Sequence, residues 1–541
     1  MQPMGFDLGR FPVTDAKRTV RDGLILCGMS AVIVACFVWA QQDLFFNLLD
    51  EGSLWYGVWR TAAGEVPIKD FLSYDPGRYY FCAALTRLFG DGPIGLRWAA
   101  GVFQWLGLSC GMLVLKRMLS SRLAQAGAAC LIMIWMIPWY KTFEQSIALM
   151  AVYGACLLLE RPSGARFFWG GCFVGLAAFL GQNHGAYIGL SYLVVMLLAG
   201  IGAEFRVVLR RFGAFTAGVL MGLLPLVGMI VGVDGFLEGC LRRFEFIASG
   251  VANLSLEVPW PWRAGGPGRD GILFLHELCT GLFFVLLPLS YAAVLICAAF
   301  GAIRKRPRTL PDLPVACAVV GLPYLHHVFG RADLPHLAQG IPAFLLLAVF
   351  FIRWLARRAR AWHGAVAFAA GLGLVCASCF SAGLANPVYR RASAPPGALA
   401  KTEIGGDALV MYSTEAATID GVREAVARHL RREDRILVAP HWPGFYPILE
   451  KTSPLWELYF LFPDSKERQL EKIAALEEKK VGWVFMGDDA VMRADGLSFR
   501  DTHPLLWEYI ENHFTTVSRG KGGAFGWMLM KRVPLPLAGG L

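Results

Sequence analysis

Charged residues are scarce in this chain of 541 residues. They make up 17% of the sequence, against about 25% in soluble domains. Hydrophobic residues reach 56%, and the mean hydropathy is +0.48. This composition excludes an ordinary soluble protein. The chain also lacks a P-loop, so nucleotide binding has no support from a phosphate-binding motif.

Cysteine is absent from the C-terminal tail that begins at Ala385, so no disulfide framework supports that part of the chain. Most of the 13 cysteines lie in apolar stretches, where cysteine acts as a small hydrophobe. The tail alternates helix and strand patterns over 385–541, which predicts a small α/β domain.

The net charge of +10 does not indicate nucleic-acid binding, because the basic residues gather in short connections between apolar stretches. Lysine and arginine in short loops mark the cytoplasmic side of a membrane and face anionic headgroups there. The clusters are Arg10, Lys17, Arg18 and Arg21; Lys116, Arg117 and Arg122; Arg161 and Arg166; Arg206, Arg210 and Arg211; 304–308; and 353–360.

About eleven apolar stretches between residues 23 and 384 approach the length needed to cross ~30 Å of hydrocarbon. With the N-terminus inside, every basic cluster becomes cytoplasmic, and the acidic and histidine-bearing loops fall outside. We therefore expect a polytopic α-helical membrane protein with a C-terminal extracytoplasmic α/β domain. The predicted membrane domain is 1–384, with long outer loops at 41–93 and 234–270.

The first outer loop carries an unusual acidic pair. Asp50 and Glu51 are expected just past the first span, where the negative end of a helix disfavours carboxylates by up to about 1 kcal/mol. One reading of the pair is a solvated cap at the membrane surface; the other is a functional site. Further along the loop come Gly64, Pro67, Asp70, Pro76 and Gly77.

This stretch, from Asp50 to Tyr80, resembles the first extracytoplasmic loop of the GT-C glycosyltransferases. These membrane enzymes use polyprenyl-phosphate-linked sugars and include protein O-mannosyltransferases and lipid A aminoarabinose transferases. The resemblance implies a GT-C fold and makes Asp50 the catalytic or acceptor-binding acid, with Glu51 beside it. Asp70 and Tyr74, in the same stretch, are expected to support the site.

A second cluster, Arg331, Asp333 and His336, has an R-x-D-x-x-H spacing that resembles a motif of some bacterial GT-C enzymes. Arginine matches phosphate in a bidentate way. We therefore expect Arg331 and a protonated His336 to hold the phosphate of a lipid-linked donor, with Asp333 orienting them. The alternative is an interfacial loop whose arginine binds a lipid headgroup.

Three weaker candidates also lie in predicted outer loops. Glu144 matches a second acidic position that GT-C enzymes often have, and Lys141 is a candidate for contact with the donor phosphate. His184 lies in a polar turn that a loop would need in any case. Glu51, Glu144 and His184 are candidate ligands of a divalent metal, a cofactor that the sequence does not establish.

The resemblance implies an inverting hexosyl- or pentosyltransferase. It would move a sugar from a polyprenyl-phosphate donor to a hydroxyl of a lipid or glycan acceptor, in assembly of cell-envelope polysaccharide or glycolipid. Asp50 would be the general base. The expected location is a bacterial cytoplasmic membrane with a periplasmic tail. The alternatives are a flippase or transporter of lipid-linked saccharide, a ligase of the O-antigen type that uses a diphosphate donor, and a non-catalytic scaffold.

Overall fold

The computed structural model of the chain describes residues 16–248, 256–265, 270–303, 310–358, 361–487, 498–522 and 525–533. Arg10 and the basic cluster 304–308 lie outside these residues. Contacts divide the chain into two compact units. The first comprises Met1–Ala40, Ala100–Gly232 and Asn253–Arg390, and the second comprises Gln41–Ala99, Val233–Ala252 and Arg391–Leu541. The first predicted outer loop, 41–93, thus groups with the tail, whereas the second, 234–270, is divided between the two units.

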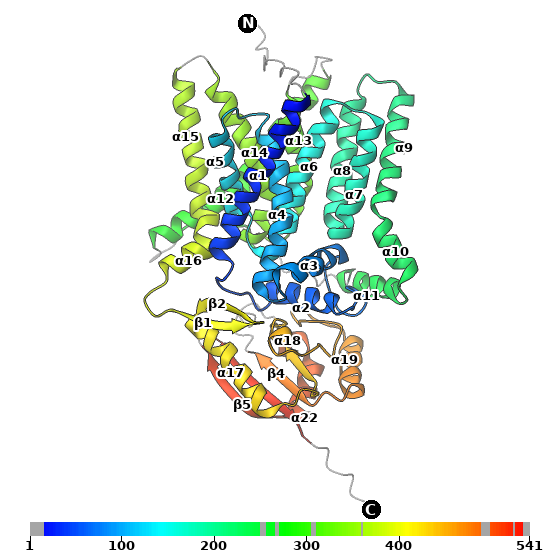
Figure 1. Ribbon diagram of the computed structural model, residues 1–541, viewed down its shortest axis with the longest axis vertical. Coiled ribbons are helices and arrows are strands. Elements are labelled where there is room, and N and C mark those ends of the chain that lie inside the picture. The colour runs from blue at the N-terminus through cyan, green and yellow to red at the C-terminus, as the bar shows by residue number, and fades with distance from the viewer. Residues whose placement is uncertain are drawn as a thin grey trace, which may run out of the picture. The chain divides into compact units, whose positions relative to one another are not determined.

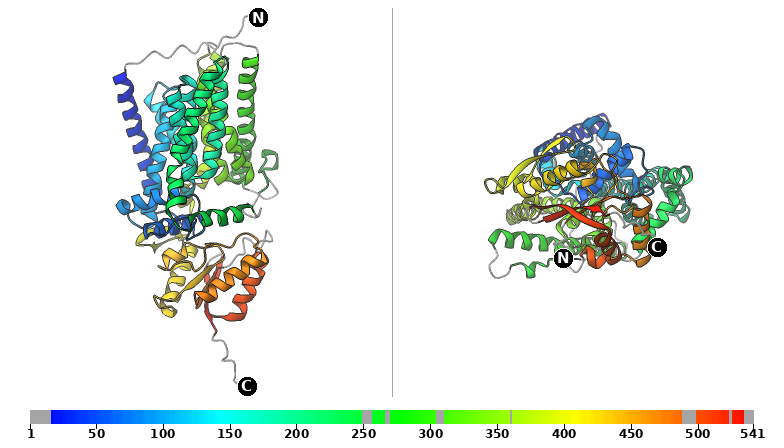
Figure 2. Two further views of the ribbon diagram at one scale, coloured as in Figure 1. Left: turned by 90° about the vertical axis from the view of Figure 1, so that its right-hand side faces the viewer. Right: turned by 90° about the horizontal axis from the view of Figure 1, so that it is seen from below.

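The first unit is built from long apolar helices (Figures 1 and 2). In chain order they are α1 Ala16–Gln41, α4 Pro93–Leu115, α5 Arg122–Trp135, α6 Thr142–Glu160, α7 Gly164–Leu180, α8 Gln182–Gly200, α9 Phe205–Gly222, α10 Leu224–Gly232, α12 Gly271–Ile303, α13 Asp312–Gly330, α14 Leu334–Ala356 and α15 Ala361–Ser378. Short one-turn segments lie at η1 Trp139–Lys141, η2 Pro261–Arg263 and η3 Cys379–Gly383. α4 begins in the second unit and continues into the first.

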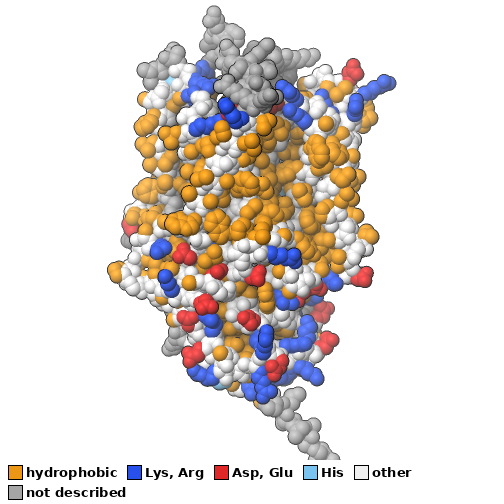
Figure 3. Space-filling view, in the orientation of Figure 1, with side chains coloured by type: hydrophobic (Ala, Val, Ile, Leu, Met, Phe, Trp, Pro, Cys, Tyr) orange, Lys and Arg blue, Asp and Glu red, His pale blue; other side chains and the backbone are white. Residues whose placement is uncertain are grey.

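Within the described residues, eight helices are long and apolar enough to cross a membrane, and the pair α9–α10, bent by 47°, makes a ninth. α5 and α7 are apolar but shorter. Hydrophobic side chains cover the outer faces of these helices (Figure 3), and several are largely exposed, including Leu123, Trp169, Leu197 and Val231. Such faces suit hydrocarbon rather than water. The chain is a multi-pass membrane protein, and the count of eleven spans stays a prediction.

Helices α7 and α9 pack with their backbones in contact. A Cβ atom built on Gly218 would lie 2.0 Å from the carbonyl oxygen of Phe168, and one on Gly222 would lie 2.2 Å from that of Cys172. Gly171 and Gly175 of α7 meet backbone atoms of α9 just as closely. Each helix therefore contributes a G-x-x-x-G pair, the pattern that permits close approach of helices in a membrane.

The second unit combines three segments of the chain. The first outer loop forms α2 Asp50–Ala62 and α3 Pro76–Phe89, and the second loop forms α11 Phe236–Ala248. In the tail are β1 Leu399–Ile404, β2 Asp407–Tyr412, α17 Ser413–His429, β3 Ile436–Ala439, α18 Phe445–Ile448, α19 Lys466–Glu478, β4 Trp483–Gly487, α21 Phe499–Thr502, α22 Pro504–His513, β5 Phe514–Gly522 and β6 Phe525–Arg532. The short helix α16 Pro387–Ser393 leads into it.

The tail's main sheet has the order β3-β4-β6-β5, with β3 parallel to β4 and the other neighbours antiparallel. α19 and α22 cover it through a core that includes Leu437, Val484, Leu476 and Leu506. The predicted α/β domain is confirmed. A second sheet, the hairpin β1–β2, was not predicted; it turns at Gly405 and Gly406, both with positive φ, as a tight two-residue hairpin requires.

Candidate functional site

The predicted site residues fall into two groups, one in each unit. The second unit holds Asp50, Glu51, Asp70 and Tyr74, and the first holds Lys141, Glu144, His184, Arg331, Asp333 and His336. The structure brings residues together within each group.

Asp50 is the first residue of α2, not the cap of the first span. α1 ends at Gln41, so the predicted position at the negative end of that helix is wrong. The side-chain oxygen of Asn47 caps α2 by accepting the backbone N–H groups of Leu49 (2.9 Å) and Asp50 (2.8 Å). Both acids of the pair therefore lie in the first turn of a helix, where the helix dipole favours negative charge.

Glu51 is buried and held by Arg97. The Arg97 Nε donates to Oε1 of Glu51 at 2.7 Å and Nη2 donates to Oε2 at 2.9 Å, with both side chains at most 5% exposed. The same guanidinium donates to the backbone carbonyls of Gln42, Leu44 and Phe45. Glu51 thus fixes the loop that precedes α2 and is already bound on both oxygens.

Asp50 differs from its neighbour. Its side chain is half-buried, and its carboxylate makes no hydrogen bond or ion pair with any residue in the described part of the chain. Tyr459, in the tail loop after α18, lies near enough to be affected: burial first, then Tyr74 and Asp50, raise the pKa of the Tyr459 phenol above its usual range. Asp50 is therefore a carboxylate that makes no hydrogen bond with a described residue and that contributes to the raised pKa of Tyr459.

A further ion pair in this unit was not predicted. Asp75, which precedes α3, accepts two hydrogen bonds from Arg243 of α11, at 2.9 and 3.4 Å. Both side chains are largely buried. Asp75 falls within the stretch that resembles the GT-C loop, but its partner is 168 residues away, so only a structure could reveal the pairing.

Asp70 and Tyr74, predicted to support the site, have local contacts. Asp70 is exposed and its Oδ2 accepts the backbone N–H of Val66 at 2.7 Å, which closes a turn. The Tyr74 ring lies 4.7 Å from the guanidinium of Arg78, and its backbone N–H donates to the hydroxyl of Tyr79 at 3.1 Å. These contacts order the loop between α2 and α3.

In the first unit, a buried polar cluster joins three helices. Glu144, in the first turn of α6, lies 4.0 Å from Nε2 of His184 at the start of α8. Nδ1 of His184 shares a hydrogen bond of 3.1 Å with the hydroxyl of Tyr324 on α13, and His327 lies beside the same imidazole at 5.6 Å between ring centroids. The structure thus brings together Glu144 and His184, two of the three residues that the sequence analysis grouped as candidate metal ligands.

Lys141 precedes α6, with its ammonium 5.9 Å from the centre of the Tyr140 ring. It is half-buried. Glu144 lies three residues further along the chain, in the first turn of α6. The described contacts give Lys141 no assigned role, and its contact with a donor phosphate stays a prediction.

The R-x-D-x-x-H cluster is assembled in the short turn between α13 and α14. Oδ2 of Asp333 accepts from Nε of Arg331 at 2.9 Å, and its Oδ1 lies 2.6 Å from Nδ1 of His336 and caps the backbone N–H of that residue. Burial opposes ionisation of Asp333, but the hydrogen bonds and charge of His336, together with Arg331, lower the pKa of the carboxyl. Asp333 therefore contacts both Arg331 and His336, and its orienting role stays a prediction.

The candidate metal ligands do not form a site within either unit. No group of three or more His, Cys, Asp or Glu side chains lies close enough to hold a metal in the parts of the chain that are described. Glu144 and His184 make a pair only, and Glu51 is occupied by Arg97. These residues do not fit a metal centre.

Comparison with known proteins yields a likeness in structure alone. No family model and no curated protein matches the chain. Among solved structures, it is similar to ArnT from Cupriavidus metallidurans in the apo state, with a TM-score of 0.50 and 14% identity over 94% of this chain and 98% of that chain.

Two further structures are similar over most of the chain. One is ArnT bound to undecaprenyl phosphate, with a TM-score of 0.49 and 15% identity over 95% of this chain and 98% of that chain. The other is the archaeal oligosaccharyltransferase AglB from Archaeoglobus fulgidus, in complex with an inhibitory peptide and a dolichol-phosphate, with a TM-score of 0.47 and 11% identity over 94% and 74%. The likeness to apo ArnT confirms the fold that the resemblance of the first outer loop implies, and it shows the fold alone.

Proposed function

We propose that the protein is an inverting glycosyltransferase that moves a sugar from a polyprenyl-phosphate donor to an acceptor hydroxyl on the extracytoplasmic side of the membrane. The fold supports the general kind of enzyme, and ArnT, which has this fold, binds undecaprenyl phosphate in one of its structures. The acceptor is a hydroxyl of cell-envelope glycan or glycolipid. The sugar is a hexose or a pentose.

The observation that carries the proposal is the contrast between Asp50 and the acids around it. Glu51 and Asp75 are buried and bound by arginines, whereas Asp50 is half-buried and makes no hydrogen bond or ion pair with a described residue. A general base needs a free lone pair within reach of the proton that it takes. Asp50 meets this requirement on a helix fixed by the Glu51–Arg97 pair.

In the proposed reaction, the acceptor hydroxyl donates its proton to Asp50 as its oxygen attacks the anomeric carbon. The bond from that carbon to the phosphate oxygen breaks, and polyprenyl phosphate leaves with the bonding electrons. One displacement inverts the anomeric centre. Proton transfer to a positioned base contributes roughly 10²–10⁴ to the rate.

Arg331 and His336 are the proposed partners of the leaving phosphate. Arg331 uses Nε to bind Asp333, which leaves its two terminal nitrogens for a bidentate contact with phosphate oxygens. His336 is held by the same carboxylate through its Nδ1. Fixed positive groups of this kind stabilise charge that develops on a leaving group.

Asp50→Asn tests the proposal. Full-length protein in lipid nanodiscs is given radiolabelled polyprenyl-phosphate sugars and extracted cell-envelope acceptors. We expect wild-type transfer, and a loss of roughly 10²–10⁴ in the Asp50→Asn variant because the amide cannot take the proton. Glu65→Gln is the matched control, an acid of the same loop in a partly exposed pair with Arg60. Full transfer by Asp50→Asn would refute the proposed base, and no transfer from any donor would refute the function.

A further inference from the structure

Helix α11 exposes an apolar stripe that the proposed chemistry does not use. The stripe consists of Leu237, Leu241, Phe244 and Ile247, each at least 42% exposed. These residues follow one another at intervals of four, three and three, so they lie along one side of the helix. Contiguous exposed apolar surface of this kind marks an interaction site.

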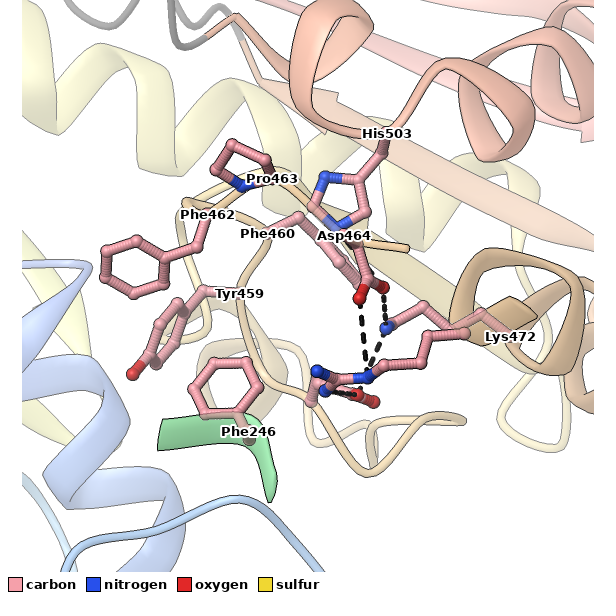
Figure 4. Close-up of a pocket in the computed structure, with 10 residues that line it drawn as sticks. Phe246, Tyr459, Phe460, Phe462, Pro463, Asp464, Lys472 and His503 are labelled. Atoms are coloured by element: carbon pink, nitrogen blue, oxygen red, sulfur yellow. Dashed lines mark hydrogen bonds and ion pairs between the residues drawn. The ribbon is translucent and has the colours of Figure 1, made fainter. Parts of the chain in front are cut away.

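A different side of α11 packs on the second unit. Arg243 on that side binds Asp75. The Phe246 ring lies 6.3 Å from that of Phe462, centroid to centroid, and Figure 4 shows it directed toward Tyr459. These contacts hold α11 on the second unit, and the stripe is not needed for that purpose.

Charged side chains form a third side of α11. Glu238, Arg242 and Glu245 are exposed, and each directly follows a stripe residue, which places it about 100° further round the helix. A helix whose exposed apolar and charged sides are separated in this way lies in a membrane interface, with the apolar side among acyl chains. Two acids and one arginine give no net attraction to anionic lipid, so the apolar stripe must supply the binding energy.

The chain ties α11 to a membrane span. The bent pair α9–α10 ends at Gly232 and α11 begins at Phe236, so only three residues join them. Because consecutive Cα atoms are about 3.8 Å apart, α11 begins within about 15 Å of the end of that span. With 13 residues it is about 20 Å long, too short to cross ~30 Å of hydrocarbon. Its length and position therefore suit a helix that lies at the membrane surface.

Helix α3 has the same kind of link to a span. It ends at Phe89, three residues before the candidate span α4 begins at Pro93, and both Leu88 and Phe89 are exposed. Asp75, the residue that precedes α3, is the partner of Arg243 in α11. This ion pair therefore joins two helices that are each three residues from a span.

We infer that α11 is an interfacial helix whose stripe, Leu237, Leu241, Phe244 and Ile247, inserts among the acyl chains just below the lipid headgroups. The partner is the phospholipid leaflet on the side of the tail. The packed side of α11, through Arg243 and Phe246, then anchors the second unit to that leaflet. This role does not depend on the proposed transferase.

Lipid photolabelling of the full-length protein tests the inference. Nanodiscs are made from neutral phosphatidylcholine that carries a trifluoromethyl aryl diazirine on an acyl chain, and adducts are mapped by mass spectrometry after irradiation. We expect about ten times more adducts at Leu241 than at Leu470, because burying such a side chain in hydrocarbon is worth about 1.5–3 kcal/mol. Leu470 is the matched internal control, since it is 49% exposed on α19, far along the chain from the last candidate span, Trp362–Gly383.

Substitutions within the stripe make the test sharper. Phe244→Glu should reduce the adducts at Leu241 about tenfold, because a carboxylate resists entry into hydrocarbon, and Phe244→Leu should preserve them. Leu470→Glu, the same change on α19, should leave them unaltered. Unchanged protection of strand β4 from hydrogen exchange shows that each variant keeps a folded tail.

The outcomes separate this inference from the proposed function. Equal labelling of Leu241 and Leu470, labelling of Leu241 that Phe244→Glu does not reduce, or a second copy of the chain that shields the stripe from lipid would each overturn the anchor. Sugar transfer is measured on the same nanodiscs. Transfer without labelling of α11 would refute the anchor alone, and labelling without transfer from any donor would refute the transferase alone.

Discussion

Acidic side chains in the second unit differ in what already binds them. Glu51 and Asp75 each form an ion pair with an arginine that is distant in sequence. Arg97 lies 46 residues from Glu51, and Arg243 lies 168 residues from Asp75. Asp50 is the neighbour that remains unpaired within the described residues. The sequence identifies the acidic pair from its loop. It could not give Glu51 a structural role and Asp50 the proposed catalytic role, because Arg97, whose ion pair distinguishes Glu51, is distant in sequence.

Replacement of Arg97 tests the structural role of Glu51. Arg97→Met leaves a buried carboxylate and three backbone carbonyls without their donor, and losing one partner of a buried ion pair costs roughly 3–5 kcal/mol. We expect a clear fall in the thermal midpoint of the purified protein. Arg60→Met is the control, since the Arg60–Glu65 pair is partly exposed and worth less than about 1 kcal/mol. Equal midpoints for the two variants would contradict the assignment.

His503 makes the tail sensitive to acid. Burial, followed by the charges of Lys472, His441 and Arg468, lowers the pKa of its imidazole to about 3. The unfolded chain, with a pKa of about 6.5, binds a proton at mildly acidic pH that the folded tail does not. Stability from this group is therefore full above about pH 6.5 and falls with pH, by roughly 2 kcal/mol at about pH 5.

Hydrogen exchange of strand β4 in the full-length protein measures this effect. Protection should decrease between about pH 7 and about pH 5, after correction for intrinsic exchange, and His503→Phe should remove most of the decrease while keeping the ring contact with Phe499. His429→Gln, an exposed histidine on α17, should leave it unchanged. An unaltered decrease in His503→Phe would assign the acid sensitivity to other groups, such as Glu457, whose lowered pKa acts in the same direction at lower pH.

At the scale of elements, the helical membrane unit and most tail elements are confirmed because hydrophobic length and periodicity define them locally, whereas the count of eleven spans stays a prediction. α22 was predicted with its observed bounds, Pro504–His513. α3 and α11 were missed, since they lie in long polar loops whose helices are held by distant contacts such as Asp75–Arg243. The β1–β2 hairpin was missed although Gly405-Gly406 signalled a turn between two short strands.

The sequence also contains the pattern that signals the contact between α7 and α9, two G-x-x-x-G pairs, which the sequence analysis did not use. Gly218→Leu should separate the helices, because a side chain there meets the carbonyl of Phe168, and overpacking of this kind costs about 1–3 kcal/mol. The thermal midpoint in nanodiscs measures it. Gly213→Leu, on the same helix with no atom within 4 Å of a built Cβ, is the matched control. Similar midpoints would mean that the helices do not depend on this contact.

At the scale of the whole molecule, the predicted orientation is open to a direct test. Basic connections such as the one between α4 and α5, with Lys116 and Arg117, are predicted to be cytoplasmic, and the tail extracytoplasmic. Alkaline phosphatase fused after Leu541 should be active in a bacterial host, and the same enzyme fused after Leu119 should be inactive. Green fluorescent protein at the two positions should give the opposite pattern. An inactive phosphatase at the C-terminus would show that the tail is cytoplasmic and that the predicted orientation is wrong.

The glycine contacts of α7 and α9 have a consequence for the surrounding lipid. A carbonyl oxygen about 2 Å from where a Cβ would stand leaves no gap as wide as a methylene chain. The two helices therefore leave no lipid-sized opening between them at Gly171, Gly175, Gly218 and Gly222. The isoprenoid tail of the proposed donor would not pass between α7 and α9 at this level of the first unit.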